Sequence, residues 1–272
     1  MTPTPSPYET FRQLHESGCF VIPNPWDAGS ARVLAQLGFP ALATTSSGFA
    51  WSQGRQDNAI SLDDALEHFR TIAGSVDVPV NGDFEGAFAI EPADVAVNMA
   101  RAATTGVAGL SIEDATGAAD DPLFEFALSV ERVRAARQGI DRSGVPVLLT
   151  ARSEGFIVGR PDLAETIRRL VAYAEAGADC LYAPGIRTPE DIAAVVKAVA
   201  PKPVNLLVGG GFATVPQMAA FGVRRISVGS ALARAAWTGF MQAAKEIAEQ
   251  GTFTRLGEAI PFGEVNGWFR LA

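Results

Sequence analysis

The chain has 272 residues, with 22 Lys or Arg and 30 Asp or Glu, so its net charge is −8. Its 48% hydrophobic and 19% charged residues are typical of a folded protein with a large core and exclude disorder or a coiled coil as its main state. The negative charge gives no general attraction for nucleic acid or an anionic membrane. No apolar run reaches about 18 residues, and the N-terminus lacks the features of a signal peptide. We therefore expect a cytoplasmic protein that binds neither.

The cysteine and histidine contents limit the kinds of site that can be built. Two cysteines, Cys19 and Cys180, are too few for a disulfide framework or a cysteine-rich zinc site. Two histidines, His15 and His68, likewise exclude a histidine-rich metal site.

The chain alternates between short apolar runs and helical patterns. The runs have the length of buried parallel strands and lie at Phe20–Pro23, Ala41–Thr45, Val78–Asn81, Gly109–Ile112, Val145–Thr150, Cys180–Ala183, Pro203–Val208 and Arg225–Val228. The helices are predicted at Gly29–Leu37, Leu62–Ala73, Pro92–Thr104, Val130–Gln138, Leu163–Glu175, Pro189–Val199, Val215–Phe221 and Ala231–Gln250. Gly38, Gly106, Gly177 and Gly222 each precede a strand, where glycine can end a helix in the left-handed conformation.

Eight strand–helix units in about 250 residues predict an α/β fold of the (β/α)8 TIM-barrel type. An open doubly wound sheet is the alternative, but the turn after the first strand lacks its Gly-x-Gly-x-x-Gly pattern. We expect a single domain over 1–272, with the barrel at about 18–250. The C-terminal helical extension and its aromatic tail at 251–272 would pack on the barrel or on a neighbouring subunit.

Catalytic groups of such barrels lie at the carboxyl ends of the strands. Asp83 and Glu85 follow the third strand, where a spacing of two would put them on one face, and Glu113 ends the fourth. Three carboxylates without His or Cys suit Mg²⁺ or Mn²⁺. The competing interpretation is that they are solvated loop acids or helix caps.

Other strand ends carry binding candidates. Arg152 ends the fifth strand, either as a salt-bridge partner of Glu85 or Glu113 or as an anchor for a substrate carboxylate. Thr45, Ser46 and Ser47 form a turn of small residues that could hold an anion, although for this turn taken alone ordinary turn chemistry is the better explanation. The remaining substrate-binding candidates at strand ends are Trp26, Asp27, Tyr182 and Asn205.

Five segments resemble the isocitrate lyase/phosphoenolpyruvate mutase superfamily: Pro25–Ala31, Thr45–Gly48, Gly82–Gly86, Gly109–Asp114 and Thr150–Glu154. The resemblance covers roughly residues 10–250. It implies a Mg²⁺-dependent enzyme that binds a 2-oxo acid or its enolate, in a homo-oligomer that is usually a tetramer with swapped last helices; a dimer is the smaller alternative.

The resemblance also assigns roles. It implies that Asp83 is the principal metal ligand, with Glu85 and Glu113 beside it and partly acting through water. Thr45, Ser46 and Ser47 would hold the substrate carboxylate and Arg152 the other end. We count Arg152, Glu113 and Asp57, a loop acid near the metal, as the catalytic candidates.

The segment after the fourth strand departs from the family. Lyases carry a catalytic cysteine there, and phosphonopyruvate enzymes a lysine and an asparagine, but residues 115–124 contain none of these. The first hypothesis is a carbon–carbon lyase, or a ligase in reverse, that acts on a small 2-oxo acid or malate-like diacid through a metal-stabilised enolate. The alternatives are a decarboxylase of the oxaloacetate type, which needs no thiol, and a non-catalytic 2-oxo-acid-binding protein.

Overall fold

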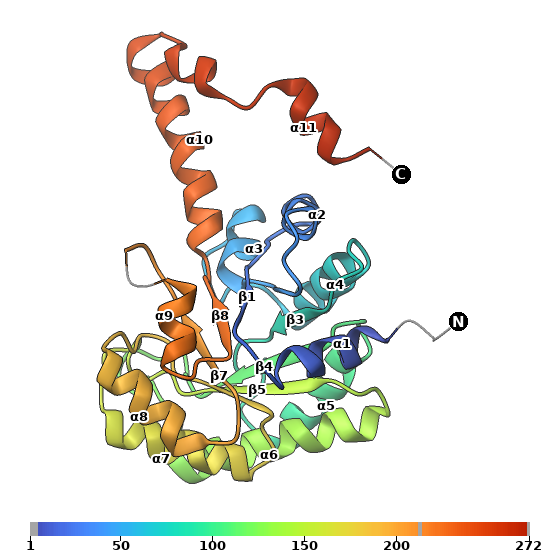
Figure 1. Cartoon of the computed structure of the whole chain (residues 1–272), viewed down its shortest axis with the longest axis vertical. Helices are drawn as coiled ribbons and strands as arrows, with labels where there is room; N and C mark the ends of the chain where they lie inside the picture. Colours follow the sequence, from blue (N-terminus) through green and yellow to red (C-terminus); the bar gives the residue numbers. More distant parts are fainter. Residues whose placement is uncertain (1–4, 212–213, 271–272) are drawn as a thin grey trace.

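The computed structural model describes residues 5–211 and 214–270 and confirms the predicted α/β barrel. Eight parallel strands form a nearly closed sheet in the order β1-β8-β7-β6-β5-β4-β3-β2 (Figure 1). They are β1 (Phe20–Ile22), β2 (Leu42–Ala43), β3 (Val80–Asp83), β4 (Gly109–Glu113), β5 (Leu148–Arg152), β6 (Cys180–Tyr182), β7 (Val204–Leu207) and β8 (Arg225–Ser227). The Ala43 N–H donates to the Pro23 carbonyl at 3.0 Å and links the two ends of the sheet.

Each strand is followed by a helix, and all of these helices except the last, α10, cover the outside of the barrel. These helices are α2 (Ala28–Gln36), α4 (Leu62–Ala73), α5 (Pro92–Ala103), α6 (Phe126–Ser143), α7 (Leu163–Glu175), α8 (Pro189–Val199), α9 (Val215–Ala220) and α10 (Ala231–Gln250). The four glycines predicted before strands all have positive φ, between 86° and 110°. The predicted start of α6 was wrong: Glu125 caps the helix, so it begins four residues before Val130.

One helix that the sequence analysis did not predict closes the amino end of the barrel. In α1 (Pro7–Leu14), Phe11 is fully buried and packs with Phe20, the first residue of β1. His15, just after α1, donates from Nδ1 to the Phe11 carbonyl and lies 3.4 Å from the guanidinium of Arg225, the first residue of β8. The carboxyl ends of the strands are therefore the open end of the barrel.

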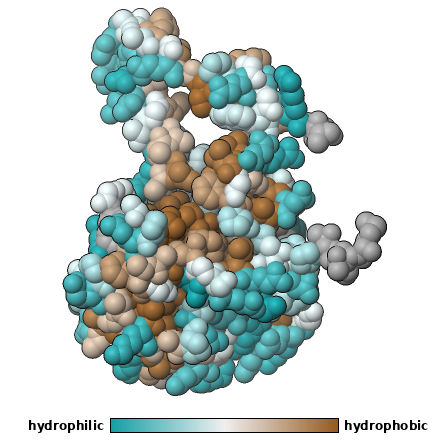
Figure 2. Space-filling view, in the orientation of Figure 1, coloured by the Kyte–Doolittle hydropathy of each residue, from teal (hydrophilic) through white to brown (hydrophobic). Residues whose placement is uncertain are grey.

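Helix α10 leaves the barrel as a projecting arm (Figure 1), and only Ala233 along it is buried. Trp237, Phe240 and Met241 are 41%, 59% and 42% exposed. The chain then returns through the 3₁₀ helix η1 (Thr254–Glu258) and α11 (Phe262–Trp268), where the Gln36 amide donates to the Trp268 carbonyl at 2.6 Å. The tail thus packs in part on the barrel, as expected, while apolar surface remains visible around the base of the arm (Figure 2).

No helix in the described part of the chain is long and apolar enough to cross a membrane.

His68 in α4 is 6% exposed and stacks on Phe49 with ring centroids 3.9 Å apart. Burial lowers the pKa of His68 from 6.5 to about 4, against a small opposing effect of Asp27.

This shift predicts a pH-dependent stability. Between pH 6.5 and 4 the unfolded chain binds a proton at His68 that the folded chain does not, so this contribution to stability is lost as the pH falls. His68→Phe keeps the stacked ring and removes the titration. From pH 6.5 to pH 5 we expect the variant to lose about 2 kcal/mol less of its free energy of unfolding than the wild type. Urea unfolding at the two pH values measures this difference, and parallel losses would contradict it.

Candidate active site

A cavity of about 1060 Å³ opens at the carboxyl ends of the strands. Its inner end is lined by polar residues from β2 to β8 and its mouth by the loops after β3, β4 and β5. Ten predicted site residues line it: Thr45, Ser46, Ser47, Asp57, Asp83, Glu85, Glu113, Arg152, Tyr182 and Asn205. The strand ends therefore bring most of the candidates together.

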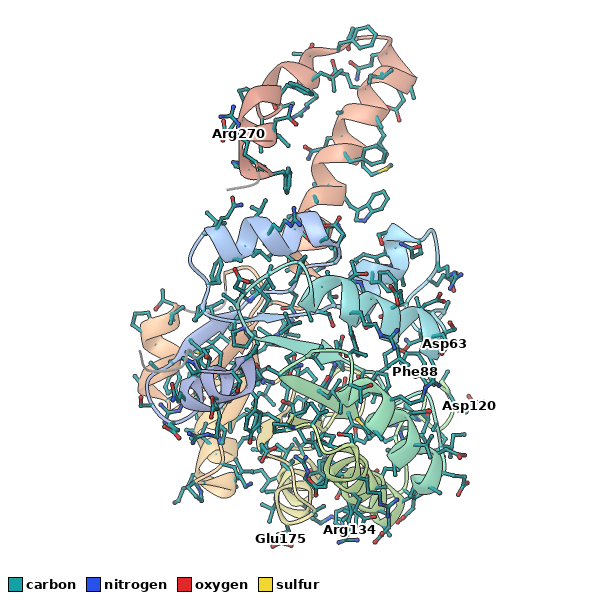
Figure 3. All side chains as sticks on the ribbon, turned by 90° about the vertical axis from the view of Figure 1, so that its right-hand side faces the viewer. Asp63, Phe88, Asp120, Arg134, Glu175 and Arg270 are labelled. Atoms are coloured by element: carbon teal, nitrogen blue, oxygen red, sulfur yellow. The ribbon has the colours of Figure 1, made fainter. Side chains whose placement is uncertain are left out.

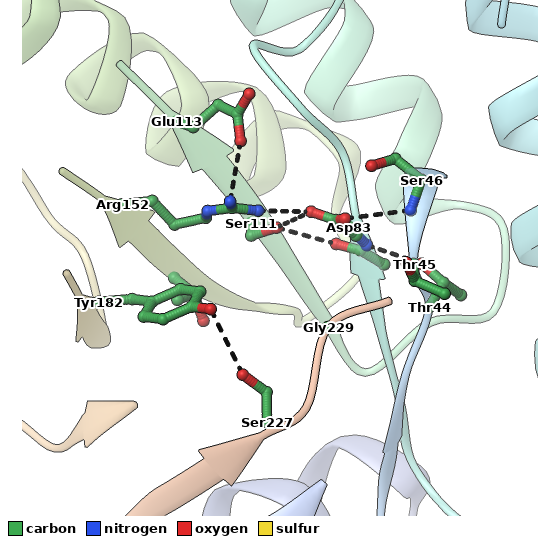
Figure 4. A network of polar contacts seen from close by, with 12 residues as sticks. Thr44, Thr45, Ser46, Asp83, Ser111, Glu113, Arg152, Tyr182, Ser227 and Gly229 are labelled. Carbon is green, nitrogen blue, oxygen red and sulfur yellow. Dashed lines mark hydrogen bonds and ion pairs between the residues drawn. The ribbon is translucent and has the colours of Figure 1, made fainter. Parts of the chain in front are cut away.

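Arg152 lies at the centre of the acidic groups (Figure 4). Its Nη1 donates to Asp83 at 2.8 Å, its Nε donates to Glu154 at 2.7 Å, and its Nη2 lies 3.2 Å from Glu113. Burial works to lower the pKa of Arg152, but Glu154, Glu113 and Asp83 outweigh it and raise the pKa. The predicted salt bridge to Glu113 is confirmed, whereas Arg152 forms no ion pair with Glu85.

Asp83 is held in place from four sides. Besides Arg152, the Ser46 N–H donates to its Oδ2 at 3.1 Å and the Ser111 hydroxyl donates to its Oδ1 at 3.3 Å. The Asp83 N–H in turn donates to the Thr44 hydroxyl at 2.8 Å. Strands β3, β4 and β5 and the segment that follows β2 thereby fix one carboxylate at the inner end of the cavity.

Glu85 differs from its predicted arrangement. Strand β3 ends at Asp83, and Glu85 has a φ of 47°, so the two residues do not share a strand face. Glu85 is 9% exposed, and its Oε1 is buried with no hydrogen-bond partner. Burial, followed by the charges of Asp83 and Asp57, raises the pKa of Glu85 to about 8.

The other acids share this environment. Burial raises the pKa of Glu113 and of Glu154, with Arg152 opposing in each case, and burial together with Asp83 raises the pKa of Asp57. Five carboxylates thus lie near the guanidinium of Arg152, so the local charge in this part of the cavity is negative.

The predicted metal trio needs a correction. Within residues 5–211 and 214–270, no three Asp, Glu, His or Cys side chains form a group that could hold a metal ion by themselves. Asp83, Glu85 and Glu113 are not such a set, because Arg152 bridges Asp83 and Glu113. The unpartnered oxygen of Glu85 beside Asp83 and Asp57 nevertheless fits a hard cation that keeps much of its water.

Thr45 is not part of a turn. It caps a short helix that was not predicted, α3 (Ser46–Ser52), and its hydroxyl accepts from the Gly48 N–H at 3.3 Å. Glycine is required at position 48, because a Cβ there would lie 2.7 Å from the Thr45 methyl group. Ser46 and Ser47 therefore face the cavity from the first turn of a helix.

Tyr182 and Asn205 form the wall opposite Asp83. The Asn205 amide donates to the Ser227 hydroxyl at 2.9 Å, and Ser227 donates to the Tyr182 hydroxyl at 3.5 Å. The Arg152 guanidinium lies 5.2 Å from the centre of the Tyr182 ring. Burial raises the pKa of Tyr182 to about 12, so this phenol keeps its proton at neutral pH.

Two predicted substrate-binding residues lie outside the cavity. Asp27 is exposed and accepts from the Ser30 N–H at 2.7 Å as the N-cap of α2. Trp26 lines a separate small pocket at the base of α10 with Trp237 and Phe240. The loop after β1 turns both side chains away from the strand ends, so these two assignments were wrong.

A buried polar network behind the cavity was not predicted. Asp114 accepts from the Glu154 N–H at 2.8 Å, from the Tyr173 hydroxyl at 2.6 Å and from Arg169 at 3.1 Å. Arg169 also donates to the Phe124 carbonyl at 3.0 Å. The Asp that follows Glu113 in the sequence was the available signal, but its partners on α7 are 55 and 59 residues away.

A second buried arginine holds the segment after β3. Arg132 of α6 is 1% exposed and donates to the carbonyls of Gly86, Ala89 and Ile90. Three residues of this segment, Glu85, Ala87 and Phe88, have positive φ without being glycine, a backbone that surrounding contacts must maintain. Arg132 thus supports the segment that carries Glu85.

Comparisons with known proteins agree with this fold. The sequence profile of the phosphoenolpyruvate phosphomutase family matches residues 11–248. A solved Burkholderia cenocepacia J2315 protein, whose assignment as a lyase/mutase is itself provisional, is 50% identical over 96% of this chain and 95% of its own, with a TM-score of 0.93. A structure of oxaloacetate acetylhydrolase with its product oxalate is 27% identical over 97% and 93% of the two chains, with a TM-score of 0.85.

A curated sequence relative is the oxaloacetate decarboxylase of Bradyrhizobium diazoefficiens, which is 28% identical over 68% of this chain and 65% of its own. The fold and the site define a TIM-barrel protein of the lyase and mutase class. More particularly, the chain belongs to the phosphoenolpyruvate mutase/isocitrate lyase superfamily, as its sequence resemblance implied.

The Asp114 network predicts a large, local effect on stability. Asp114→Asn would leave the Arg169 guanidinium buried beside a neutral amide, so we expect the free energy of unfolding to fall by about 3 kcal/mol. Tyr173→Phe removes one neutral donor from the same carboxylate and should cost only about 1 kcal/mol. Urea unfolding of both variants at pH 7.5 tests this order, and equal losses would show that the charge of Asp114 is not what stabilises the network.

Proposed function

We propose that this protein is a divalent-metal-dependent enzyme that cleaves the carbon–carbon bond next to the carbonyl of a small 2-oxo acid, in the first instance by releasing CO₂ from a 2-oxo diacid. The observation that carries the proposal is the loop after β4. Ala115, Gly117, Ala118 and Phe124 line the cavity from it, and its described residues include no cysteine, lysine or histidine. Decarboxylation suits such a loop, because it requires charge stabilisation and no thiol acid.

The residues around Glu85 would hold the metal. Asp83 is the proposed principal ligand of Mg²⁺ or Mn²⁺, with Glu85, Asp57 and water completing the shell; Glu113 would act from behind Arg152. When bound, the ion supplies Lewis-acid charge for the oxygens of the 2-oxo acid. Its charge also explains how a protein with a net charge of −8 could bind a dianion.

The other residues would bind the substrate and manage its charge. Ser46 and Ser47, with Thr45 behind them, are placed to bind the carboxylate next to the carbonyl. When CO₂ leaves, the electron pair of the broken bond passes to the adjacent carbon and the carbonyl oxygen becomes an enolate. Arg152 would offset that negative charge from close by. Tyr182 holds a proton at its hydroxyl, from which it, or water, would protonate the carbon.

We also propose that the protein acts as a homo-oligomer, a tetramer or a dimer, in which α10 packs against a second copy of the chain. Trp237, Phe240 and Met241 lie on an arm that the barrel does not cover. Burial of such side chains is the main favourable term in association.

A panel of substrates tests the proposed chemistry. With MgCl₂ the protein should release pyruvate and CO₂ from oxaloacetate, and Asp83→Asn should lower kcat/KM at least about a hundredfold, the scale of losing one electrostatic contribution to a developing charge. Asp63→Asn is the matched control, because Asp63 is 82% exposed and pairs with Arg101 on the surface (Figure 3). Cleavage of a malate-like diacid into two organic products, without release of CO₂, would favour the lyase instead. Binding without turnover would favour the non-catalytic alternative, and full activity of Asp83→Asn would contradict the site.

The proposed assembly predicts a size. In sedimentation experiments the wild type should have a mass well above the 28.5 kDa of one chain. The double variant Trp237→Glu, Phe240→Glu should have a mass closer to that of the monomer. The exposed pair Arg70 and Glu67 on α4 offers a control, since Glu67→Lys should leave the assembly unchanged. A wild type that sediments as a monomer at all concentrations would overturn the assignment.

A further inference from the structure

The cavity has two chemically different ends. Four of its carboxylates, from Asp83, Glu85, Glu113 and Glu154, lie at the inner end around Arg152, and the charge of the exposed loop residue Asp57 acts on Asp83 at the same end. The mouth is formed by residues 88–90, 115–124 and 157–158. Among the described residues of these segments, none that lines the cavity is charged. A ligand that fills the cavity therefore meets charge at one end only.

The mouth is apolar and exposed. Ile90 and Ile157 line it from the loops after β3 and β5 and are 61% and 51% exposed, and Phe88 and Phe124, both half-buried, line it as well. The loops after β3 and β4 are neighbours, because the Glu113 N–H donates to the Glu85 carbonyl at 3.0 Å. Figure 3 shows Phe88 and Asp120 of these two loops on the same side of the molecule.

Arg132 also lines the cavity behind this wall, but its guanidinium is engaged by backbone carbonyls. Arg132 donates to the carbonyls of Gly86, Ala89 and Ile90, and its guanidinium stacks 4.0 Å from the centre of the Phe124 ring. It is 1% exposed, so it supports the wall without presenting a cation to a ligand. A second carboxylate at the mouth would thus find no charged partner there, whereas an uncharged alkyl group would gain from burying apolar area against this wall.

The size of the cavity also exceeds what a four-carbon acid needs. Its volume of about 1060 Å³ lies at the upper limit of the roughly 300–1,000 Å³ that hold drug-sized ligands. A 2-oxo acid bound at the inner end would leave the apolar mouth empty.

From this division we infer that the substrate is a 2-oxo acid extended by an uncharged alkyl or aryl group, which lies along the wall formed by Phe88, Ile90, Phe124 and Ile157. The inference rests on the proposed function for the position of the acid group at the inner end. In the decarboxylation, the group would be a substituent on the carbon that keeps the electron pair when CO₂ leaves.

Binding measurements can test this without turnover. We would titrate the protein in MgCl₂ with pyruvate, 2-oxobutanoate, 2-oxopentanoate and 2-oxohexanoate by calorimetry. Kd should fall about fourfold per methylene group, which corresponds to about 0.8 kcal/mol. A Kd that does not change along the series, as expected if the mouth is filled by a second copy of the chain or stays wet, would overturn the inference.

A matched ligand pair and a matched variant pair sharpen the test. 2-Oxoadipate has the chain length of 2-oxohexanoate but ends in a carboxylate, so the wild type should bind it at least about tenfold more weakly. Ile157→Lys should abolish or reverse that preference. Val97→Lys should leave the preference unchanged, since Val97 is 59% exposed on α5 and does not line the cavity. A wild type that prefers 2-oxoadipate would also overturn the inference.

The two proposals can fail separately. Tight binding of 2-oxohexanoate, with no cleavage of oxaloacetate or of 3-alkyl oxaloacetates, would support the apolar subsite and contradict the proposed decarboxylation. Cleavage of oxaloacetate, with no gain in affinity from a longer chain, would support the proposed decarboxylation and contradict the apolar subsite. If no member of the series binds and oxaloacetate is not cleaved, both are wrong.

Discussion

The pairing of Arg152 with three carboxylates is the interaction on which the cavity depends. A guanidinium is stable inside a protein only when anions compensate for its lost water, and Asp83, Glu113 and Glu154 each contact one of its nitrogens. Together with Glu85 and Asp57, however, the acids outnumber the cation. The raised pKa of Glu85, to about 8, and its unpartnered oxygen express that excess. The folded chain is thus arranged to gain stability from further positive charge.

The barrel sets this arrangement through backbone positions more than through side-chain length. In register, Glu113 on β4 lies beside Arg152 on β5, and Arg152 lies beside Tyr182 on β6, so three neighbouring strands end on three interacting side chains. Behind them, Asp114 accepts from the Glu154 N–H and from Arg169 and so ties the loops after β4 and β5 to α7. A change at Asp114 or Arg169 would therefore displace the residues around Arg152 without contacting a ligand.

The sequence predicted the parts of this arrangement that follow from the order of the strands. Hydrophobic runs located all eight strands, and their ends located Asp83, Glu113 and Arg152 in one place, because parallel strands of a barrel share their carboxyl end. It could not predict contacts made across the chain or the backbone beyond a strand. The left-handed conformation of Glu85 depends on the packing of its segment, which Arg132 supports from 46 residues away. The predictions for Trp26 and Asp27 were wrong for a related reason. Both residues follow a strand, but Asp27 caps α2 and Trp26 packs beside α10.

The same reasoning explains why the loop after β4 informs the chemistry so strongly. Its ends are fixed, since the Phe124 N–H donates to the Asp114 carbonyl at 2.9 Å and the Phe124 carbonyl accepts from Arg169. The small and apolar residues of this loop line the cavity, whereas its two acids, Asp120 and Asp121, are exposed and do not. A reaction in this cavity must take its charge stabilisation from the inner end, where the Tyr182 hydroxyl and Glu85, whose pKa is raised to about 8, both hold a proton at neutral pH. In the proposed reaction, selectivity between acids of similar reactivity would then be determined at the mouth. The ligands would differ there mainly in the apolar area that they bury against Ile90, Phe124 and Ile157.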